Sequence, residues 1–185
     1  MMPEISLNVL DVAQNSVRAE ASLIQLSVIA DTAADRLTIT IQDDGCGMTA
    51  EQVAHVEDPF FTTRTTRKVG LGVPFFKMAA LCTGGDFTID STPGVGTTVT
   101  AVFGLSHIDR MPLGDMVSTV HTLITMNEHI DFVYLYQVDD RSYTLDTREF
   151  REILGDVSFQ APEVSAYIRE YLSENEQDVR QGMSI

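Results

Sequence analysis

The feature that most limits the possible folds of this chain is a glycine-containing loop, which ends the second of two short strands of alternating apolar and polar residues. Strands are predicted at residues 23–29 and 37–41, where apolar and β-branched residues alternate with polar ones. The second strand runs directly into Asp43-Asp44-Gly45-Cys46-Gly47, so a carboxylate stands where a strand with apolar surroundings ends. A plain Asp-Gly turn is the commoner meaning of such a segment. A binding site whose ligand donates an N–H group is the alternative, because an unpaired carboxylate there would be costly to desolvate.

An amphipathic helix precedes the two strands. From Ile5 to Arg18, apolar residues recur at helical spacing and leave a polar stripe that carries Asp11 and Asn15. Further along, Thr49 and Gln52 predict a capping box that begins a short helix. A third helix is predicted over 75–81, and two antiparallel strands over 87–89 and 97–103. The predicted order to residue 103 is therefore helix, two strands, helix, loop, helix and two strands.

The remaining residues predict a smaller α/β extension. The pattern indicates a helix over 113–126, a hairpin from 132–136 to 143–145, and helices over 148–154 and 162–172. Residues 174–185 read as a frayed terminus. We therefore expect two domains, at residues 1–104 and 105–185.

The charge balance argues against two classes of partner. The 185 residues contain 12 Lys and Arg against 27 Asp and Glu, a formal net charge of −15, which repels nucleic-acid phosphates and anionic lipids. The two cysteines, Cys46 and Cys82, form neither a disulfide framework nor a zinc motif. With no signal peptide and no run long enough to span a bilayer, we expect a cytoplasmic protein.

Two local patterns suggest where a phosphorylated ligand would bind. Four of the 12 basic residues gather around the glycine pair of Gly70-Leu71-Gly72, namely Arg64, Arg67, Lys68 and Lys77. Backbone N–H groups at the start of a helix bind phosphate, although a solvated basic loop is the commoner reading of such a motif alone. On the first helix, Asn15 and Asp11 offer oxygens suited to Mg2+, and a solvent-facing polar stripe is the alternative.

Taken in order, these segments closely resemble the N, G1, F and G2 boxes of the GHKL ATPase superfamily, which includes gyrase B subunits, MutL and the catalytic domains of histidine kinases. The resemblance covers roughly residues 4–103. Asn15-Ser16 with Ala19 and Ala21 is similar to the MutL form of the N box. The segments that are similar to the histidine-kinase form are Asp58-Pro59-Phe60-Phe61-Thr62-Thr63-Arg64 and Gly84-Gly85, Ser91 and Gly94-Val95-Gly96-Thr97.

The resemblance implies the fold and the ligands. The fold would be the Bergerat α/β sandwich (α+β), a two-layer arrangement of a mixed, mostly antiparallel sheet and helices, and the ligands would be ATP and Mg2+. Asn15 would bind Mg2+, Asp43 would accept a hydrogen bond from the adenine amino group, and Thr97 would assist through water. Further ATP contacts implied by position are those of Arg18, Gly45, Gly47, Gly70, Leu71 and Gly72, with Arg64, Arg67 and Lys68 neutralising phosphate charge under a lid of about residues 60–70.

Two residues are candidates for a direct part in the reaction of ATP, one in activating water and one in accepting the phosphate. Asp11 occupies the place of the glutamate that activates water in the hydrolysing members, and it is one methylene shorter. His107, in Ser106-His107-Ile108-Asp109-Arg110-Met111-Pro112-Leu113, resembles the phosphoacceptor of a displaced histidine-kinase H box, and a linker histidine that packs between subdomains is the alternative.

The function predicted from the sequence is that of a histidine-kinase-like signalling protein that binds Mg-ATP and transfers the γ-phosphate to a protein residue, as an ATP-dependent kinase of histidine-kinase or anti-sigma-factor type. The alternatives are a slow ATPase or nucleotide-driven switch, and an ATP-sensing module without turnover. Its expected partners are ATP and an unidentified protein substrate or regulator, with a homodimer as an alternative, and neither nucleic acid nor membrane.

Overall fold

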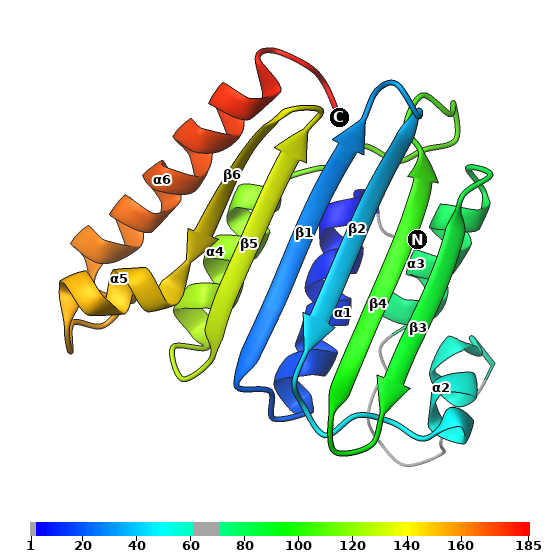
Figure 1. Cartoon of the computed structure of the whole chain (residues 1–185), viewed down its shortest axis with the longest axis horizontal. Coiled ribbons are helices and arrows are strands. Elements are labelled where there is room, and N and C mark those ends of the chain that lie inside the picture. Colours follow the sequence, from blue (N-terminus) through cyan, green and yellow to red (C-terminus); the bar gives the residue numbers. More distant parts are fainter. Residues whose placement is uncertain (1–2, 61–70) are drawn as a thin grey trace.

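The computed structural model describes residues 3–60 and 71–185, which form one mixed sheet with helices on a single face (Figure 1). The strands are β1 (Leu23–Asp31), β2 (Arg36–Asp43), β3 (Asp86–Thr92), β4 (Gly96–Gly104), β5 (Asp131–Val138) and β6 (Arg141–Asp146). The helices are α1 (Ile5–Arg18), α2 (Ala50–Glu57), α3 (Gly72–Leu81), α4 (Met116–Met126), α5 (Thr147–Leu154) and α6 (Pro162–Arg180). The two-layer α+β fold and the order of the elements predicted up to residue 103 are confirmed.

The strand order across the sheet is β3-β4-β2-β1-β5-β6. All neighbours are antiparallel except β1 and β5, which pair in parallel from Leu23 opposite Asp131 to Ala30 opposite Val138. The sheet is therefore mixed and mostly antiparallel, and β5 and β6 extend the same sheet that β1 to β4 form.

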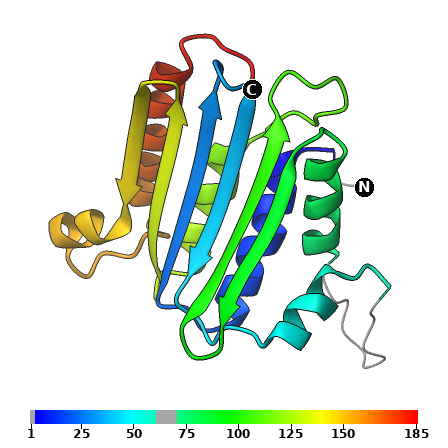
Figure 2. The same ribbon diagram turned by 45° about the vertical axis from the view of Figure 1, so that its right-hand side comes forward.

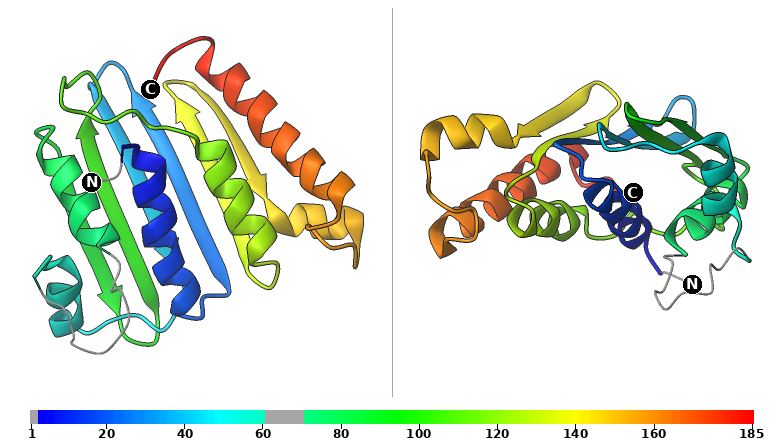
Figure 3. Two further views of the ribbon diagram at one scale, coloured as in Figure 1. Left: turned by 180° about the vertical axis from the view of Figure 1, so that it is seen from behind. Right: turned by 90° about the horizontal axis from the view of Figure 1, so that it is seen from below.

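The helices α1, α3, α4 and α6 lie side by side on one face of the sheet (Figure 3). Alternate residues of the central strands point into this layer, so that Ile24, Leu26 and Val28 of β1 are at most 3% exposed. The intervening residues of β1 point to the other face and are more exposed. The alternation that predicted the strands is thus the alternation between the helical layer and the open face.

The capping box predicted for α2 is present. Thr49 Oγ1 accepts a hydrogen bond from Gln52 N at 3.2 Å, and Thr49 N donates to Gln52 Oε1 at 2.9 Å. The backbone N–H groups of Thr49 and Gln52, which lack partners within the helix, are satisfied in this way, and the helix begins at Ala50. Figure 2 shows that α2 lies beside the end of the sheet where β3 and β4 are joined by a turn.

The prediction of a frayed terminus over 174–185 is wrong. Helix α6 continues to Arg180, Val179 and Ile185 are 5% exposed, and Leu113 N donates to Ile185 O at 3.2 Å. The core-facing positions recur at helical spacing, but Glu176 occupies one of them and hides the apolar period in the sequence. The helix predicted over 113–126 also differs at its start. Helix α4 begins at Met116, because the Asp115 side chain caps it by accepting a hydrogen bond from Ser118 N.

Within residues 3–60 and 71–185, none of the helices combines the length and the apolar character that crossing a bilayer requires.

Candidate functional site

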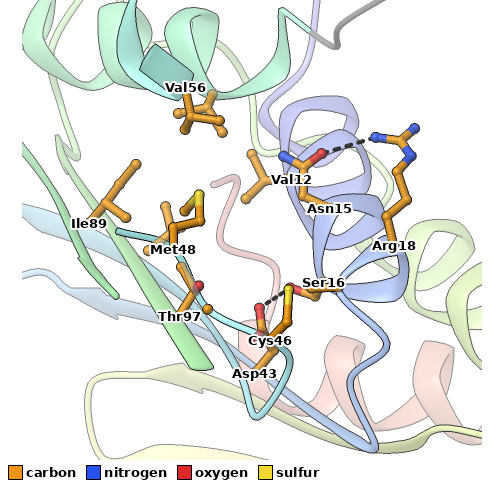
Figure 4. A pocket seen from close by; sticks show the side chains of 14 residues that line it. Val12, Asn15, Ser16, Arg18, Asp43, Cys46, Met48, Val56, Ile89 and Thr97 are labelled. Atoms are coloured by element: carbon orange, nitrogen blue, oxygen red, sulfur yellow. Dashed lines mark hydrogen bonds between the residues drawn. The ribbon is translucent and has the colours of Figure 1, made fainter. Parts of the chain in front are cut away.

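A cavity of about 260 Å³ opens between the C-terminal half of α1, the loop after β2, helix α2 and the ends of β3 and β4. Figure 4 shows side chains from these elements pointing into it from several sides. Five residues predicted from the sequence as site residues line it: Asn15, Arg18, Asp43, Gly47 and Thr97. The fold thus brings together residues as distant in the chain as Asn15 and Thr97.

Asp43 lies at the base of the cavity as the last residue of β2. Ser16 Oγ donates to Asp43 Oδ2 at 2.5 Å, and Gly45 N donates to Asp43 Oδ1 at 2.9 Å (Figure 4). These two bonds fix the plane of the carboxylate. Each oxygen keeps further accepting capacity, so the group can accept a hydrogen bond from an N–H group of a bound molecule.

The loop after β2 is held on both sides. Cys46 N donates to Ala19 O at the end of α1 at 3.0 Å, and Gly94 N in the β3–β4 turn donates to Cys46 O at 2.7 Å. Gly47 has φ +68°, and a Cβ there would lie 2.0 Å from Thr92 O. No larger residue fits this conformation and this close approach, so the glycine predicted at 47 is required by the backbone.

Ser91 and Thr97 join the turn between β3 and β4 to this loop. Ser91 Oγ accepts from Met48 N at 2.8 Å and lies 2.8 Å from Thr97 Oγ1. Ser91, which is itself bonded to the loop, therefore positions the Thr97 hydroxyl. Thr97 lies directly opposite Asp43 in the sheet, so this hydroxyl is close to the Asp43 carboxylate end of the cavity.

The walls of the cavity are apolar. Val12 of α1, Val56 of α2, Met48 and Ile89 project into it (Figure 4), and Val73 and Val99 add to the apolar lining. An apolar slot that ends at one carboxylate suits a flat ring with an N–H donor on its edge. These residues carry no signal in the sequence, because apolar side chains at periodic positions are typical of ordinary core. Ser16 belongs to the segment that resembles the N box, but the sequence alone predicts no role for it.

The polar end of the cavity is formed by α1. Asn15 Oδ1 accepts from Arg18 Nη1 at 3.0 Å, one turn along the same face (Figure 4). In the parts of the chain that the structure describes, no three His, Cys, Asp or Glu side chains gather into a metal cluster. A hard cation here would take its remaining oxygens from a bound ligand and from water, as Mg2+ commonly does.

Asp11 lies one turn before Asn15 and packs against the start of α3. A Cβ on Gly72 would come 2.7 Å from Asp11 Cβ and 3.1 Å from Asp11 Oδ2. Leu71 precedes the helix and is 42% exposed. The other predicted residues of this region, Arg64, Arg67, Lys68 and Gly70, lie outside the described residues.

His107 lies away from the cavity. It follows β4 in an exposed turn, where its Nδ1 accepts from Asp109 N at 3.1 Å and lies 3.9 Å from Asp109 Oδ2. Thr97 is near the start of β4 and Gly104 ends it, so the strand alone separates the two regions by about 23 Å at the usual rise per residue.

Asp44 differs from its neighbour Asp43 in what surrounds it. It accepts hydrogen bonds from Ser22 N at 2.7 Å and Leu23 N at 2.9 Å, and a third from Ser22 Oγ. Desolvation raises the pKa of Asp44, but these hydrogen bonds outweigh it and hold the pKa below its ordinary value. Asp44 therefore ties the start of β1 to the end of β2, while Asp43 faces the cavity.

Comparison with known families identifies one match. Residues 4–107 match the family model described as histidine kinase-, DNA gyrase B-, and HSP90-like ATPase. This range contains every residue that lines the cavity.

Relatives with curated descriptions are bacterial proteins, and two of those described below are named as histidine kinases. The chain is 29% identical over 121 residues to a non-motile and phage-resistance protein of Caulobacter vibrioides, covering 62% of this chain and 14% of that protein. It is 29% identical over 107 residues to the signal transduction histidine-protein kinase AtoS of Escherichia coli, covering 57% of this chain and 17% of that protein. To the sensor histidine kinase RcsC of Escherichia coli it is 34% identical over 86 residues, 44% of this chain and 9% of that protein. The matched part is less than a fifth of each of these proteins.

Two solved structures share the fold. The ATPase domain of Aquifex aeolicus MutL complexed with ADP aligns with a TM-score of 0.52 at 14% identity, over 83% of this chain and 70% of that one. The N-terminal domain of a DNA repair protein aligns with a TM-score of 0.55 at 15% identity, over 78% of this chain and 53% of that one. Both alignments cover more of the chain than residues 4–107, so the likeness in fold extends into the C-terminal elements.

Proposed function

The chain belongs to the histidine kinase-, DNA gyrase B- and HSP90-like ATPase family, and from this premise we propose that it binds Mg-ATP in the cavity beside α1 and transfers the γ-phosphate to a residue of a partner protein. The matching curated relatives include two named histidine kinases, which favours protein phosphorylation over other uses of ATP.

The carboxylate of Asp43 is the observation that carries the proposal. It ends an apolar slot, and Ser16 and Gly45 hold it with accepting capacity to spare. Adenine has a flat apolar ring with an amino group on one edge, so the ring would lie between Met48, Ile89 and the α1 side while its amino group donates to Asp43. Thr97 would complete this end through a water molecule.

The phosphates would extend toward the polar end of α1 and the start of α3. Asn15 would supply an oxygen to Mg2+, whose charge helps to neutralise the phosphates, and Arg18 would contact phosphate oxygens. The N-terminus of α3, at Gly72, would direct backbone N–H groups and the positive end of the helix dipole at the same place. Residues 64, 67, 68 and 70 are proposed to add the contacts that their positions in the motif imply.

The phosphoacceptor is proposed to belong to a second molecule. In the transfer, the bond between the γ-phosphorus and the oxygen bridging it to the β-phosphate breaks, a bond from the acceptor atom forms, and ADP leaves. His107 of the same chain lies beyond the far end of β4, about 23 Å along the strand from Thr97. If His107 accepts the phosphate, it therefore does so from the cavity of another copy.

The test is to incubate the purified chain with γ-labelled Mg-ATP and to follow labelled protein and free phosphate together. We expect the chain to bind ATP and to give one of two labelling results. Either the chain, incubated without a partner, takes up no label, or it takes up acid-labile label that His107→Ala removes. The first result calls for a partner substrate, and the second identifies a kinase that acts between copies. Binding that Asn15→Ala and Asp43→Asn both leave unchanged would refute the site.

A second function is favoured by the position of Asp11. Its carboxylate lies against Gly72, where the γ-phosphate end of the nucleotide would be, and a carboxylate there can orient a water molecule for hydrolysis. The chain would then be a slow ATPase or a nucleotide-driven switch, and Asp11→Asn would abolish release of free phosphate while leaving ATP binding intact. An ATP-sensing module would bind nucleotide and give neither product.

A further inference from the structure

Helix α3 has more apolar surface than the sheet can cover. Its sequence is apolar on all sides except for Lys77. Val73, Phe76 and Ala80 face the sheet and are at most 3% exposed, whereas Met78 and Leu81 on the outer side are 46% and 48% exposed. A helix that is apolar all round is normally covered all round, so the outer side of α3 indicates a ligand or a partner.

A cavity of about 400 Å³ lies along this outer side, between the first turns of α1, the last turns of α3 and residues 109–111. The side chains of Phe75, Met78 and Met111 form most of its apolar wall, together with Ala79 and Cys82. This volume lies within the range of sites that bind small molecules, and a mostly apolar lining with few polar groups is typical of them.

Asn8 is the polar group of this cavity. It is 1% exposed, and within the described part of the chain neither its Nδ2 nor its Oδ1 has a hydrogen-bond partner. Buried amides are almost always paired, because an unmade hydrogen bond away from water is costly. Asn8 borders the cavity with one unpaired donor and one unpaired acceptor, which the C=O and N–H of another amide would match.

The charged groups that line the cavity disfavour an anion, and the neighbouring Arg110 guanidinium donates to Leu105 O and Met111 O. Asp109 is the charged residue of the lining, and no Lys or Arg is among the described residues that form it. A carboxylate would pair with the donating atom of Asn8 but would leave the accepting atom unsatisfied and would meet Asp109. A neutral carboxamide satisfies both atoms of Asn8 without this repulsion.

From these observations we propose that the cavity between α1, α3 and residues 109–111 binds a compact, uncharged, apolar molecule that carries a carboxamide, paired with Asn8. The cavity is separate from the one that ends at Asp43: Asn8 is near the start of α1, and Asn15 is two turns further along it. Figure 3 shows α1 and α3 adjacent on the same face of the sheet, so the ligand would contact both helices at the end where α1 begins and α3 ends.

The test uses three probes of similar size: benzamide, benzoate and toluene. The full chain is labelled at its methionine methyl groups with carbon-13, and the signals are assigned by single Met→Leu substitutions. We expect benzamide to shift the Met78 and Met111 signals saturably and to leave Met126, which is 68% exposed at the end of α4, unchanged. Benzoate and toluene should bind at least about 10-fold more weakly, since each leaves part of the Asn8 amide unpaired.

Two variants make the result specific. Asn8→Leu should reduce benzamide binding to the level of toluene, because it keeps an apolar wall but removes the amide. Ala79→Leu should fill the cavity and abolish the shift with Asn8 still present, which provides a second answer if the first variant does not fold. Asp43→Asn should bind benzamide like the wild type, so the result does not depend on the proposed ATP site.

Three outcomes would overturn the proposal. They are the absence of a saturable shift at Met78 and Met111, equal binding of the three probes, and a preference for benzamide that Asn8→Leu retains. Binding of an apolar peptide to the same methionines without binding of benzamide would also overturn it and would assign the surface to a protein partner.

Discussion

Ser16 Oγ donates a hydrogen bond of 2.5 Å to Asp43 Oδ2, joining the last turn of α1 to the last residue of β2 across 27 positions of sequence. The bond connects the two elements that bound the nucleotide cavity we propose. Both oxygens of the Asp43 carboxylate are acceptors, whereas an amide in its place would turn a donor toward Ser16 or toward the ligand.

Asp43→Asn tests this relationship. We expect ATP affinity to fall about 10- to 100-fold, the usual effect of losing a hydrogen bond to a charged group, with little change in the free energy of unfolding. Titration calorimetry and urea unfolding measure the two quantities. Asp90→Asn removes the same charge from an exposed position on β3 and should leave the affinity unchanged. An equal loss in both variants would mean that net charge, and not the Asp43 contact, controls binding.

Asp44→Asn should act on stability, with a characteristic pH dependence. Hydrogen bonds from Ser22 and Leu23 outweigh desolvation and hold the folded-state pKa of Asp44 below its ordinary value of 3.8. The stabilisation is therefore complete above the unfolded-state pKa and is lost as the pH falls through the folded-state pKa. We expect the difference in unfolding free energy between wild type and variant to be constant near neutral pH and to shrink below about pH 4. A difference that grows on acidification would contradict this.

Leu172→Ala measures the contribution of α6. Leu172 is fully buried, and truncating such a side chain costs about 2–5 kcal/mol of unfolding free energy. Tyr167→Ala is the matched control on the same helix, because Tyr167 is 53% exposed. Urea unfolding of both variants gives the comparison, and a loss below about 0.5 kcal/mol for Leu172→Ala would mean that α6 packs loosely in solution.

Thr49→Ala removes half of the capping box. The free energy of unfolding should fall by about 1 kcal/mol, because the variant leaves Gln52 N without its partner. The destabilisation should be concentrated in α2. Amide hydrogen exchange should become faster in α2 and stay unchanged in α1. Thr88→Ala, at an exposed position of β3, controls for loss of a threonine. Uniformly faster exchange in all helices would contradict a local effect.

The sequence predicted the order of elements up to residue 103 because each has a clear period and a distinct boundary, such as the Thr49 capping box or the glycines after Asp43. It did not predict that β1 pairs with β5, since nothing in a local pattern encodes a partner more than a hundred residues away. The last turns of α6 were not predicted, because the buried carboxylate of Glu176 interrupts the apolar stripe by which an amphipathic helix is identified in a sequence.

The residues of the candidate site also fall into those that the sequence predicted and those that it did not. Asn15 and Asp43 were predicted from their own positions in the helix and strand patterns, whereas Arg18, Gly47 and Thr97 were implied by the resemblance to the GHKL boxes. The apolar lining was not predicted, because Met48, Val56 and Ile89 look like core until the fold shows an opening between them. The sequence pattern places Asn8 on the polar stripe of the first helix, and only the fold shows that this residue is buried. The positions assigned between 64 and 70 remain predictions.

The parallel pairing of β1 with β5 has a consequence for how the chain is made. During translation, residues 23–31 emerge long before residues 131–138, so β1 spends that time as an open edge although it lies at the centre of the finished sheet. Pairing over so long a loop is slow, and the unfinished sheet can pair with other nascent chains. Residues 1–130 already carry 15 Asp and Glu against 7 Lys and Arg, and this negative charge would keep such intermediates apart until the missing strand arrives.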